Sequence, residues 1–327
     1  MKLFITGTSG FIGYHLAKES LERGLVVVGI DSVTDYYDTR IKEKRNDDLS
    51  KYQNFTFYRE SIVNYQKTKE IMEKEMPDVI VHLAAQAGVR YSLKNPWAYL
   101  DSNYVGTLNI FECAKELNIK KILFASSSSV YGSNSKMPFS EDDKTDTPLS
   151  IYAASKKANE VLAYSYHHLY GIDAIGLRFF TVYGEYGRPD LALFKFVKNI
   201  LSDKEITLFN NGNMTRNFTY VKDVVSGILG IINKDIKGYE IYNLGGNEAT
   251  SLIKFVELIE TNLNIKAKVR LMPIQPGDVP ATIADISKAK RDFGFEPKTS
   301  IEDGIKIFVE WFVQNKEWLL ELEEDKN

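Results

Sequence analysis

Strand-like and helix-like segments alternate along the first 180 residues, and this alternation limits the possible folds more than any other feature of the chain. Apolar runs with the length of buried strands occupy 2–6, 25–30, 55–58, 79–83, 121–126 and 174–180. Helical spacing follows the first strand and recurs near 66–76, 96–118 and 151–170. Strands separated by helices, without hairpin signals, predict a parallel sheet. Because the runs are rich in Val and Ile and do not alternate with polar residues, we expect an α/β fold with helices on both faces, a doubly wound sheet.

A glycine-rich turn joins the first strand to the first helix and points to a dinucleotide. The sequence GTSGFIG follows the strand directly, and Asp31 closes the second strand. The helix N-terminus can hold a pyrophosphate through backbone N–H groups, and an acid at this distance binds the adenosine ribose. Because a carboxylate there repels a 2′-phosphate, we expect NAD rather than NADP. The predicted turn residues are Gly7, Gly10, Phe11, Ile12 and Gly13.

The second half of the chain is less regular. Short strand-like segments (206–209, 239–244 and 267–271) mix with helical ones near 190–202, 222–233, 251–263 and 301–320. We expect residues 1–180 to form an NAD-binding domain of the Rossmann type. Residues 181–327 are expected to form a smaller mixed α/β substrate domain, with an approximate boundary and interleaved segments.

Composition excludes several classes of partner. The formal net charge is −3 and no long basic block occurs, so we expect neither nucleic acid nor an anionic membrane surface as a partner. No segment reaches the roughly 18 apolar residues of a membrane span, and MKLFITG is too short for a signal peptide. The single cysteine, Cys113, suits a reducing compartment. We therefore expect a cytoplasmic protein, and the four histidines form no metal-ligand pattern.

Two further stretches carry residues suited to acid–base chemistry. In YAASK, Tyr152 and Lys156 lie one helical turn apart on the same face. An ammonium beside a phenol, together with a positive nicotinamide ring, lowers the pKa of the phenol and makes Tyr152 a plausible general base. FASSSSVYG places four serines at the end of a predicted strand.

These stretches resemble the extended short-chain dehydrogenase/reductase family, and within it the NAD-dependent nucleotide-sugar epimerases. The resemblance covers nearly the whole chain and is carried by TGTSGFIG, HLAAQAGVRYS, FASSSSVYG, YAASKKANE, RFFTVYGEYGRPD, TRNFTYVKD and PGDVPAT. GVRYSLKNP and GRPDLALFKF are most similar to the UDP-glucuronate 4-epimerase branch. The resemblance implies oxidation at carbon 4 of a UDP-sugar, return of the hydride to the other face, and a homodimer formed by a four-helix interface from 96–118 and 151–170.

The resemblance also implies residue roles. Ser127, Tyr152 and Lys156 are expected to be catalytic, with Tyr152 as the base. Further cofactor contacts are expected at Ile62, Leu83, Ala84, Ala85 and Asn103. The residues expected to bind substrate are Arg90, Ser128, Ser129, Thr181, Arg188, Arg216 and Asp278.

Three functions remain open from the sequence, and a UDP-glucuronate 4-epimerase is the first choice. The acids that 4,6-dehydratases and decarboxylases carry beside the catalytic hydroxyl are replaced here by Ser128 and Ser129. Thr181 stands where galactose epimerases have an Asn, and a shorter polar group suits a carboxylate. A UDP-glucose/UDP-galactose or UDP-N-acetylhexosamine 4-epimerase is the second choice. The third is an inactive NAD-sensing regulator, a class that typically lacks the Tyr or Lys.

Overall fold

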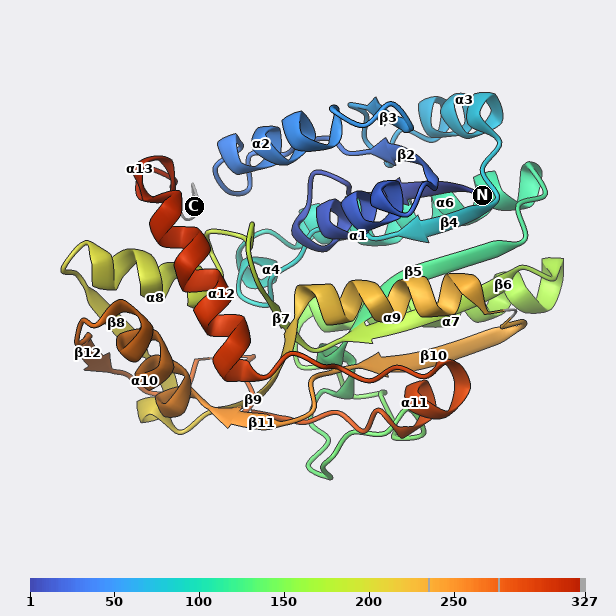
Figure 1. Ribbon diagram of the computed structural model, residues 1–327. Coiled ribbons are helices and arrows are strands. Elements are labelled where there is room, and N and C mark those ends of the chain that lie inside the picture. The colour runs from blue at the N-terminus through green and yellow to red at the C-terminus, as the bar shows by residue number, and fades with distance from the viewer. Residues whose placement is uncertain (235, 276, 324–327) are drawn as a thin grey trace.

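The computed structural model describes residues 1–234, 236–275 and 277–323. Within these residues one parallel sheet of seven strands forms the centre of the molecule, in the order β10-β6-β5-β4-β1-β2-β3 (Figure 1). The strand order turns back at β1, which is the arrangement of a doubly wound sheet. The predicted α/β fold is therefore confirmed. The strands are β1 (Lys2–Thr6), β2 (Val26–Ile30), β3 (Phe55–Tyr58), β4 (Val79–His82), β5 (Lys121–Ser127), β6 (Asp173–Phe179) and β10 (Tyr239–Leu244).

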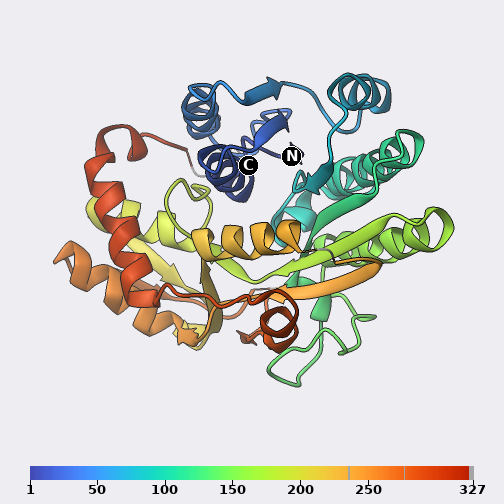
Figure 2. The ribbon, with the colours of Figure 1, turned by 45° about the vertical axis from the view of Figure 1, so that its right-hand side comes forward.

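Helices cover both faces of this sheet because successive strand residues are apolar. In β1, Leu3 and Ile5 pack with helices α1 and α9, whereas Phe4 packs with α6 and α7 on the opposite face. Figure 2 shows the resulting three layers. The helices that cover the two faces are α1 (Phe11–Glu22), α9 (Val221–Asn233) and α11 (Ser287–Phe293) on one, and α3 (Tyr65–Glu75), α6 (Gly106–Glu116) and α7 (Ile151–Tyr170) on the other.

The remaining elements gather beside the carboxyl ends of the strands, at the left of Figure 1. Most of them share a second apolar core, in which Phe194, Phe308 and Phe312 are buried. These elements are α8 (Ala192–Leu201), α10 (Leu252–Leu263), α12 (Ile301–Gln314), α13 (Lys316–Leu319), β7 (Thr181–Tyr183), β8 (Glu205–Leu208), β9 (Thr215–Tyr220), β11 (Ala249–Ser251), β12 (Lys268–Leu271) and β13 (Ala281–Thr282). Because β10 and α9 return to the large sheet, segments beyond residue 180 belong to both parts. The boundary at residue 180 stays a prediction.

Some local predictions were wrong. The helix expected over 96–118 is divided: α4 (Tyr91–Lys94) and α5 (Pro96–Tyr99) precede a π-helical segment (Leu100–Val105), and α6 follows. Short π-helical segments occur mostly where a helix must present a side chain out of register. Helix α2 (Arg40–Leu49) was not predicted, because its sequence RIKEKRNDDL is polar almost throughout.

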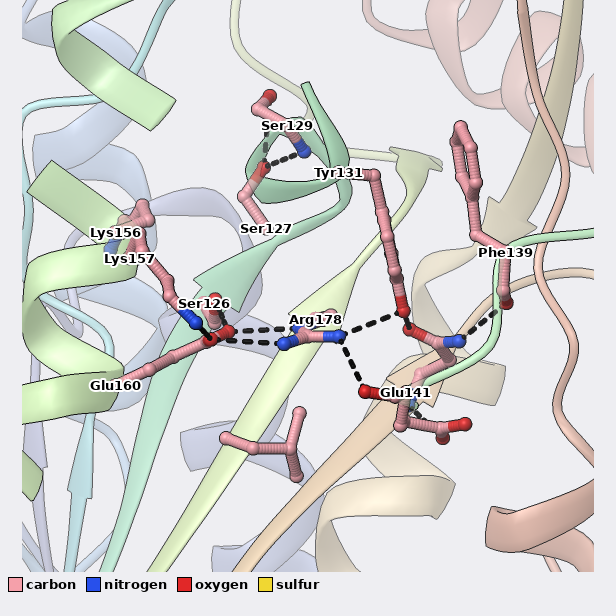
Figure 3. A network of polar contacts seen from close by, with 12 residues as sticks. Ser126, Ser127, Ser129, Tyr131, Phe139, Glu141, Lys156, Lys157, Glu160 and Arg178 are labelled. Carbon is pink, nitrogen blue, oxygen red and sulfur yellow. Dashed lines mark hydrogen bonds and ion pairs between the residues drawn. The ribbon is translucent and has the colours of Figure 1, made fainter. Parts of the chain in front are cut away.

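A buried polar network ties α7 to the sheet (Figure 3). The Glu160 carboxylate accepts from Arg178 Nε at 2.9 Å and Nη2 at 3.0 Å, and from the Ser126 hydroxyl at 2.6 Å. Arg178 Nη1 donates to the Tyr131 hydroxyl at 3.0 Å, which donates to Asn243 Oδ1 at 2.7 Å. The network therefore joins α7, β5, β6 and β10, and it fixes the depth at which α7 sits on the sheet.

The Glu160→Ala variant is expected to lose about 3–5 kcal/mol of unfolding free energy, because Arg178 would be left as a buried unpaired charge. The matched control is Glu19→Ala, which breaks the exposed Arg23–Glu19 pair and should lose less than about 1 kcal/mol. Urea unfolding measures both values. Similar losses in the two variants would show that the network contributes no more than a surface ion pair.

Candidate active site

A cavity of about 420 Å³ lies along the carboxyl ends of the sheet strands. Its lining comes from the turn after β1 and from the ends of β2, β4, β5 and β6. Open parallel sheets bind ligands at this edge. The predicted cofactor-binding residues that line this cavity are Gly7, Gly10, Phe11, Ile12, Gly13, Asp31, Ile62, Leu83, Ala84, Ala85, Tyr152 and Lys156.

The turn between β1 and α1 has no room for side chains at its glycines. A Cβ atom on Gly13 would lie 2.1 Å from the Gly7 carbonyl oxygen, and one on Gly10 would lie 2.9 Å from the same oxygen. Gly7 has a φ of +79°, which side chains disfavour. The bare backbone therefore leaves the N-terminus of α1 open to the cavity, as a pyrophosphate requires.

Asp31 is held rigidly at the end of β2. Its Oδ2 accepts the Ser9 N–H at 3.0 Å, and its Oδ1 accepts the Val33 N–H at 2.7 Å. Burial raises the pKa of Asp31, against the opposing charge of Lys42 and these two hydrogen bonds. The glycine turn and the fixed carboxylate together fit a dinucleotide with free ribose hydroxyls, which is NAD.

Asn103 is not among the residues that line the cavity, and the cofactor contact predicted for it stays a prediction. Its Oδ1 accepts the Gln86 N–H at 2.8 Å, and its Nδ2 donates to the Gln86 carbonyl at 3.0 Å and to the Ser155 hydroxyl at 2.9 Å. The side chain lies fully buried on the π-helical segment. Asn103 positions the segment after β4, whose residues Leu83 and Ala84 line the cavity.

Sequence reasoning missed several residues of the cavity wall, among them Tyr36, Lys42 and Gln86. Tyr36 and Lys42 follow β2, and Gln86 follows β4. Their position just beyond the carboxyl ends of predicted parallel strands was the signal that could have identified them.

Ser127, Tyr152 and Lys156 come together at this cavity from the end of β5 and the first turns of α7. Helix α7 begins there because the Ser150 hydroxyl accepts the Ala153 N–H at 3.0 Å. Lys156 Nζ donates to the Ala125 carbonyl at 2.9 Å, and burial lowers the pKa of Lys156 to about 8.

In the protein without cofactor, burial raises the pKa of Tyr152, while a hydrogen bond with Ser127 and the charge of Arg188 lower it in part. The lowering expected from Lys156 together with a bound nicotinamide ring stays a prediction. Lys156 itself donates to the Ala125 carbonyl. Ser127 and Arg188 are therefore the groups that favour the phenolate here.

A second cavity of about 140 Å³ adjoins the first and shares Val89 and Thr181 with it. The turn Ser128–Tyr131 forms one wall; Ser127 Oγ caps this turn by accepting the Ser129 N–H at 3.1 Å. The predicted substrate-binding residues in its lining are Ser128, Ser129, Thr181, Arg216 and Asp278.

Two of the predicted arginines meet at Asp278. Arg90 Nη2 lies 3.2 Å from Asp278 Oδ2, and Arg216 Nη2 lies 3.7 Å from Oδ1. Arg90 also covers the ring of Phe209 at 4.6 Å, and it lines neither cavity. Of Asp278 and the two arginines, Arg216 and Asp278 line the second cavity.

Arg188 lies in the lining of the larger cavity with Tyr152 and Ser127. Its Nε donates to Asp190 Oδ1 at 2.9 Å, and Nη2 donates to Oδ2 at 2.5 Å. The guanidinium also lies 5.8 Å from the ring of Tyr36. Arg188 is therefore the predicted arginine whose charge reaches the catalytic tyrosine.

No group of three or more His, Cys, Asp or Glu side chains able to hold a metal occurs in residues 1–234, 236–275 and 277–323. In the same part of the chain, no helix has the length and apolar character needed to cross a membrane.

Comparison with known proteins agrees with this geometry. The sequence model of the family described as GDP-mannose 4,6 dehydratase matches residues 4–308, and the chain belongs to that family. The predicted likeness to the nucleotide-sugar enzymes among the short-chain dehydrogenase/reductases is thereby confirmed.

Individual relatives cover nearly the full length. An uncharacterized protein of Methanocaldococcus jannaschii is 55% identical over 98% of both chains. A UDP-glucuronate 4-epimerase of Thermodesulfobacterium geofontis is 46% identical over 96% of both chains. A Bacillus cereus UDP-glucuronic acid 4-epimerase, solved with UDP-glucuronic acid and NAD, superposes with a TM-score of 0.91 at 34% identity, covering 96% of this chain and 100% of that one.

The lowered pKa of Lys156 predicts a pH-dependent stability. In the unfolded chain a lysine keeps a pKa near 10.4. The folded state therefore binds fewer protons than the unfolded state between about pH 8 and that value, and stability rises with pH across this window. Below pH 8 the lysine is charged in the folded and the unfolded state, so the full cost of burying its ammonium group lowers the stability of the cofactor-free protein. We expect cofactor-free Lys156→Met to have a higher melting temperature than cofactor-free wild type at pH 7, with the difference shrinking by pH 10. A difference independent of pH would contradict the lowered pKa.

Proposed function

We propose that this protein is an NAD-dependent nucleotide-sugar 4-epimerase that interconverts UDP-glucuronate and UDP-galacturonate. The main observation behind the proposal is that two cavities meet at Thr181. One cavity fits NAD and holds Tyr152, and the other is lined by hydroxyls and an arginine suited to a sugar nucleotide. The structural neighbour from Bacillus cereus binds this substrate and this cofactor together.

NAD, when bound, supplies a hydride acceptor for carbon 4 of the sugar and a donor that returns it. Tyr152 takes the proton of the 4-hydroxyl in the first half of the reaction and gives it back in the second. Ser127, hydrogen-bonded to Tyr152, stabilises the phenolate and orients the sugar oxygen. The 4-keto sugar turns over in the cavity between the two halves, and turnover consumes no external oxidant or reductant.

A uronate substrate sets a further demand, because oxidation at carbon 4 makes a β-keto acid that loses carbon dioxide easily. The carboxylate must be held still until the hydride returns. Ser128, Ser129 and Thr181 supply hydroxyl donors within one cavity. Arg188, beside Tyr152, supplies the charge, and because Asp190 occupies its Nε–Nη2 edge, the Nη1 side of the guanidinium is the one that would meet the sugar carboxylate.

Arg90 and Arg216 suit the other end of the substrate. Both guanidinium groups lie near the Asp278 carboxylate, which balances their charge only in part. The remaining positive charge suits the UDP pyrophosphate, and the carboxylate suits the uridine ribose. Burial lowers the pKa of Arg216, so an anion that compensates its charge is favoured there. Arg188 rather than Arg90 is therefore assigned to the sugar carboxylate.

We also infer a cytoplasmic homodimer. Large apolar side chains of α5, the π-helical segment, α6 and α7 are exposed on the described chain: Trp97, Leu100, Val105, Leu108, Val161 and Tyr164. Paired across a two-fold axis, these helices would bury the patch in a four-helix interface.

Sedimentation tests the dimer. Wild type is expected to sediment as a dimer at micromolar concentration, and Val161→Glu as a monomer, because a charge would be buried at the interface. Ile253→Glu, which changes an equally exposed apolar residue on α10, should remain dimeric. A monomeric wild type would refute this assembly.

The Tyr152→Phe variant keeps the ring but cannot carry the proton. General acid–base catalysis contributes about 100- to 10,000-fold, so we expect a loss of kcat in that range with NAD binding retained. Tyr52→Phe, a surface tyrosine bound to Glu22, is the control and should keep full activity. Interconversion of UDP-glucuronate and UDP-galacturonate is followed by NMR. Near-normal turnover by Tyr152→Phe would remove this residue from the mechanism.

The product distribution tests the uronate assignment. Wild type is expected to form UDP-galacturonate with little decarboxylated UDP-4-keto-pentose. Ser129→Ala and Thr181→Ala should raise the decarboxylated fraction severalfold, because each removes a hydrogen bond worth about 1 kcal/mol or more to a charged group. Ser133→Ala, which removes an exposed hydroxyl, is the control. If both cavity variants epimerise as cleanly as wild type, other groups hold the carboxylate. A wild type that converts only UDP-glucose or UDP-N-acetylglucosamine would establish the alternative substrates.

A further inference from the structure

Arg45, on α2, is a fully buried arginine with an unusual set of partners. Its Nη1 donates to the Ser9 carbonyl at 2.7 Å and to the Tyr37 hydroxyl at 3.0 Å, and its Nη2 donates to the Tyr186 carbonyl at 2.5 Å. Its Nε has no hydrogen-bond partner. Every partner of this cation is therefore a neutral oxygen.

No carboxylate forms an ion pair with Arg45 within the described part of the chain; the buried Arg178, by contrast, is paired with Glu160. A buried charge without an opposite charge is strongly unfavourable, so proteins usually pair it or place it beside an anion. Ser9, whose carbonyl Arg45 binds, immediately precedes Gly10, the residue that caps α1 where the pyrophosphate of NAD would lie. The charge of Arg45 already acts on the Asp31 carboxylate, which accepts the Ser9 N–H, and opposes the rise of its pKa; the cofactor pyrophosphate would add a second anion on this side.

The second carbonyl belongs to the segment that leads to Arg188. Tyr186 lies between Thr181 and Arg188, in the turn that follows β7. It has a φ of +53°, in the left-handed region that costs a non-glycine residue about 1 kcal/mol or more. A second contact supports the turn: His15 of α1 lies 2.8 Å from the Glu185 carbonyl through Nε2. Contacts from Arg45 on α2 and His15 on α1 thus hold the turn before Arg188 in this strained conformation.

We propose that Arg45 is a positioning residue that couples cofactor binding to the placement of Arg188. One guanidinium spans the glycine turn and the Arg188 turn, and the cofactor pyrophosphate adds to the compensation of its charge that Asp31 provides. Occupancy of the cofactor site therefore stabilises the bridge, and the bridge holds the arginine that meets the substrate. The role of Arg45 in placing Arg188 for the substrate rests on the proposed function, whereas its role in cofactor binding does not.

Two substitutions separate charge from geometry. Arg45→Met removes both, whereas Arg45→Lys keeps the charge but cannot reach two carbonyls with a planar fork. We expect Arg45→Met to bind NAD at least about tenfold more weakly, and Arg45→Lys within about threefold of wild type. For whichever UDP-sugar the wild type converts, KM should rise about tenfold in both variants, while kcat at saturating NAD and sugar changes little. Arg59→Met, which removes an exposed arginine paired with Glu43 of α2, is the control.

Calorimetric titration of the cofactor-free variants with NAD measures the first effect, and initial rates measure the second. NAD affinity unchanged in Arg45→Met, or lowered equally in Arg45→Lys, would overturn the role of charge. An unchanged KM in Arg45→Lys would overturn the coupling. If Arg45→Met fails to fold, Arg45→Gln replaces it as the variant that removes the charge. A wild type without epimerase activity would contradict the proposed function while leaving the NAD titration as the test of Arg45.

Discussion

The contact between the backbones of Gly7 and Gly13 is the constraint on which the rest of the site depends. With 2.1 Å between the Gly7 carbonyl oxygen and a Cβ built on Gly13, the first strand can pass into the first helix only as bare backbone. That close approach fixes where α1 begins, and the start of α1 fixes the positions of Ser9 and of the N–H groups that face the cavity. The carboxylate of Asp31 and the guanidinium of Arg45 both attach to Ser9. Cofactor recognition and the Arg188 turn are therefore built outward from one turn of seven residues.

The proposed catalytic groups depend on a different kind of support. Tyr152, Lys156 and Glu160 follow one another at intervals of four on α7, so a single helix carries the proposed proton carrier, its lysine neighbour and the anchor to Arg178. Because Glu160 is bound to both β5 and β6, a shift of α7 along the sheet would break the anchor before it displaced the phenol. The position of Tyr152 relative to Ser127 thus depends on the contacts of Glu160, two helical turns further along α7.

Much of this site could be predicted because its determinants are local in sequence. The glycine turn, Asp31 and the spacing of Tyr152 and Lys156 each depend on residues within one strand–helix unit. What could not be predicted depends on contacts between distant segments. Asn103 lies on a π-helical segment and binds the backbone of Gln86, a contact between segments that neighbouring residues in the sequence do not reveal.

The same limit applies to charges. Composition shows how many arginines the chain has, but not that Arg178 and Arg188 find carboxylates while Arg45 finds backbone oxygens. Likewise Lys156 donates to a carbonyl 31 residues away in the sequence. Tertiary distance decides which cations are available to a ligand, and sequence patterns carry no information on it.

The place of β10 has a consequence for how the protein is made. This strand pairs with β6 along its whole length, yet it lies about sixty residues further along the chain, behind β7, α8, β8, β9 and α9. While a ribosome is still synthesising those intervening residues, the emerged sheet ends at β6 with a row of unpaired N–H and C=O groups. Such an open edge invites pairing with other chains. Newly made chains are therefore most exposed to misassembly when most of the NAD site has already been synthesised, and a chaperone that shields an extended edge would act in that interval.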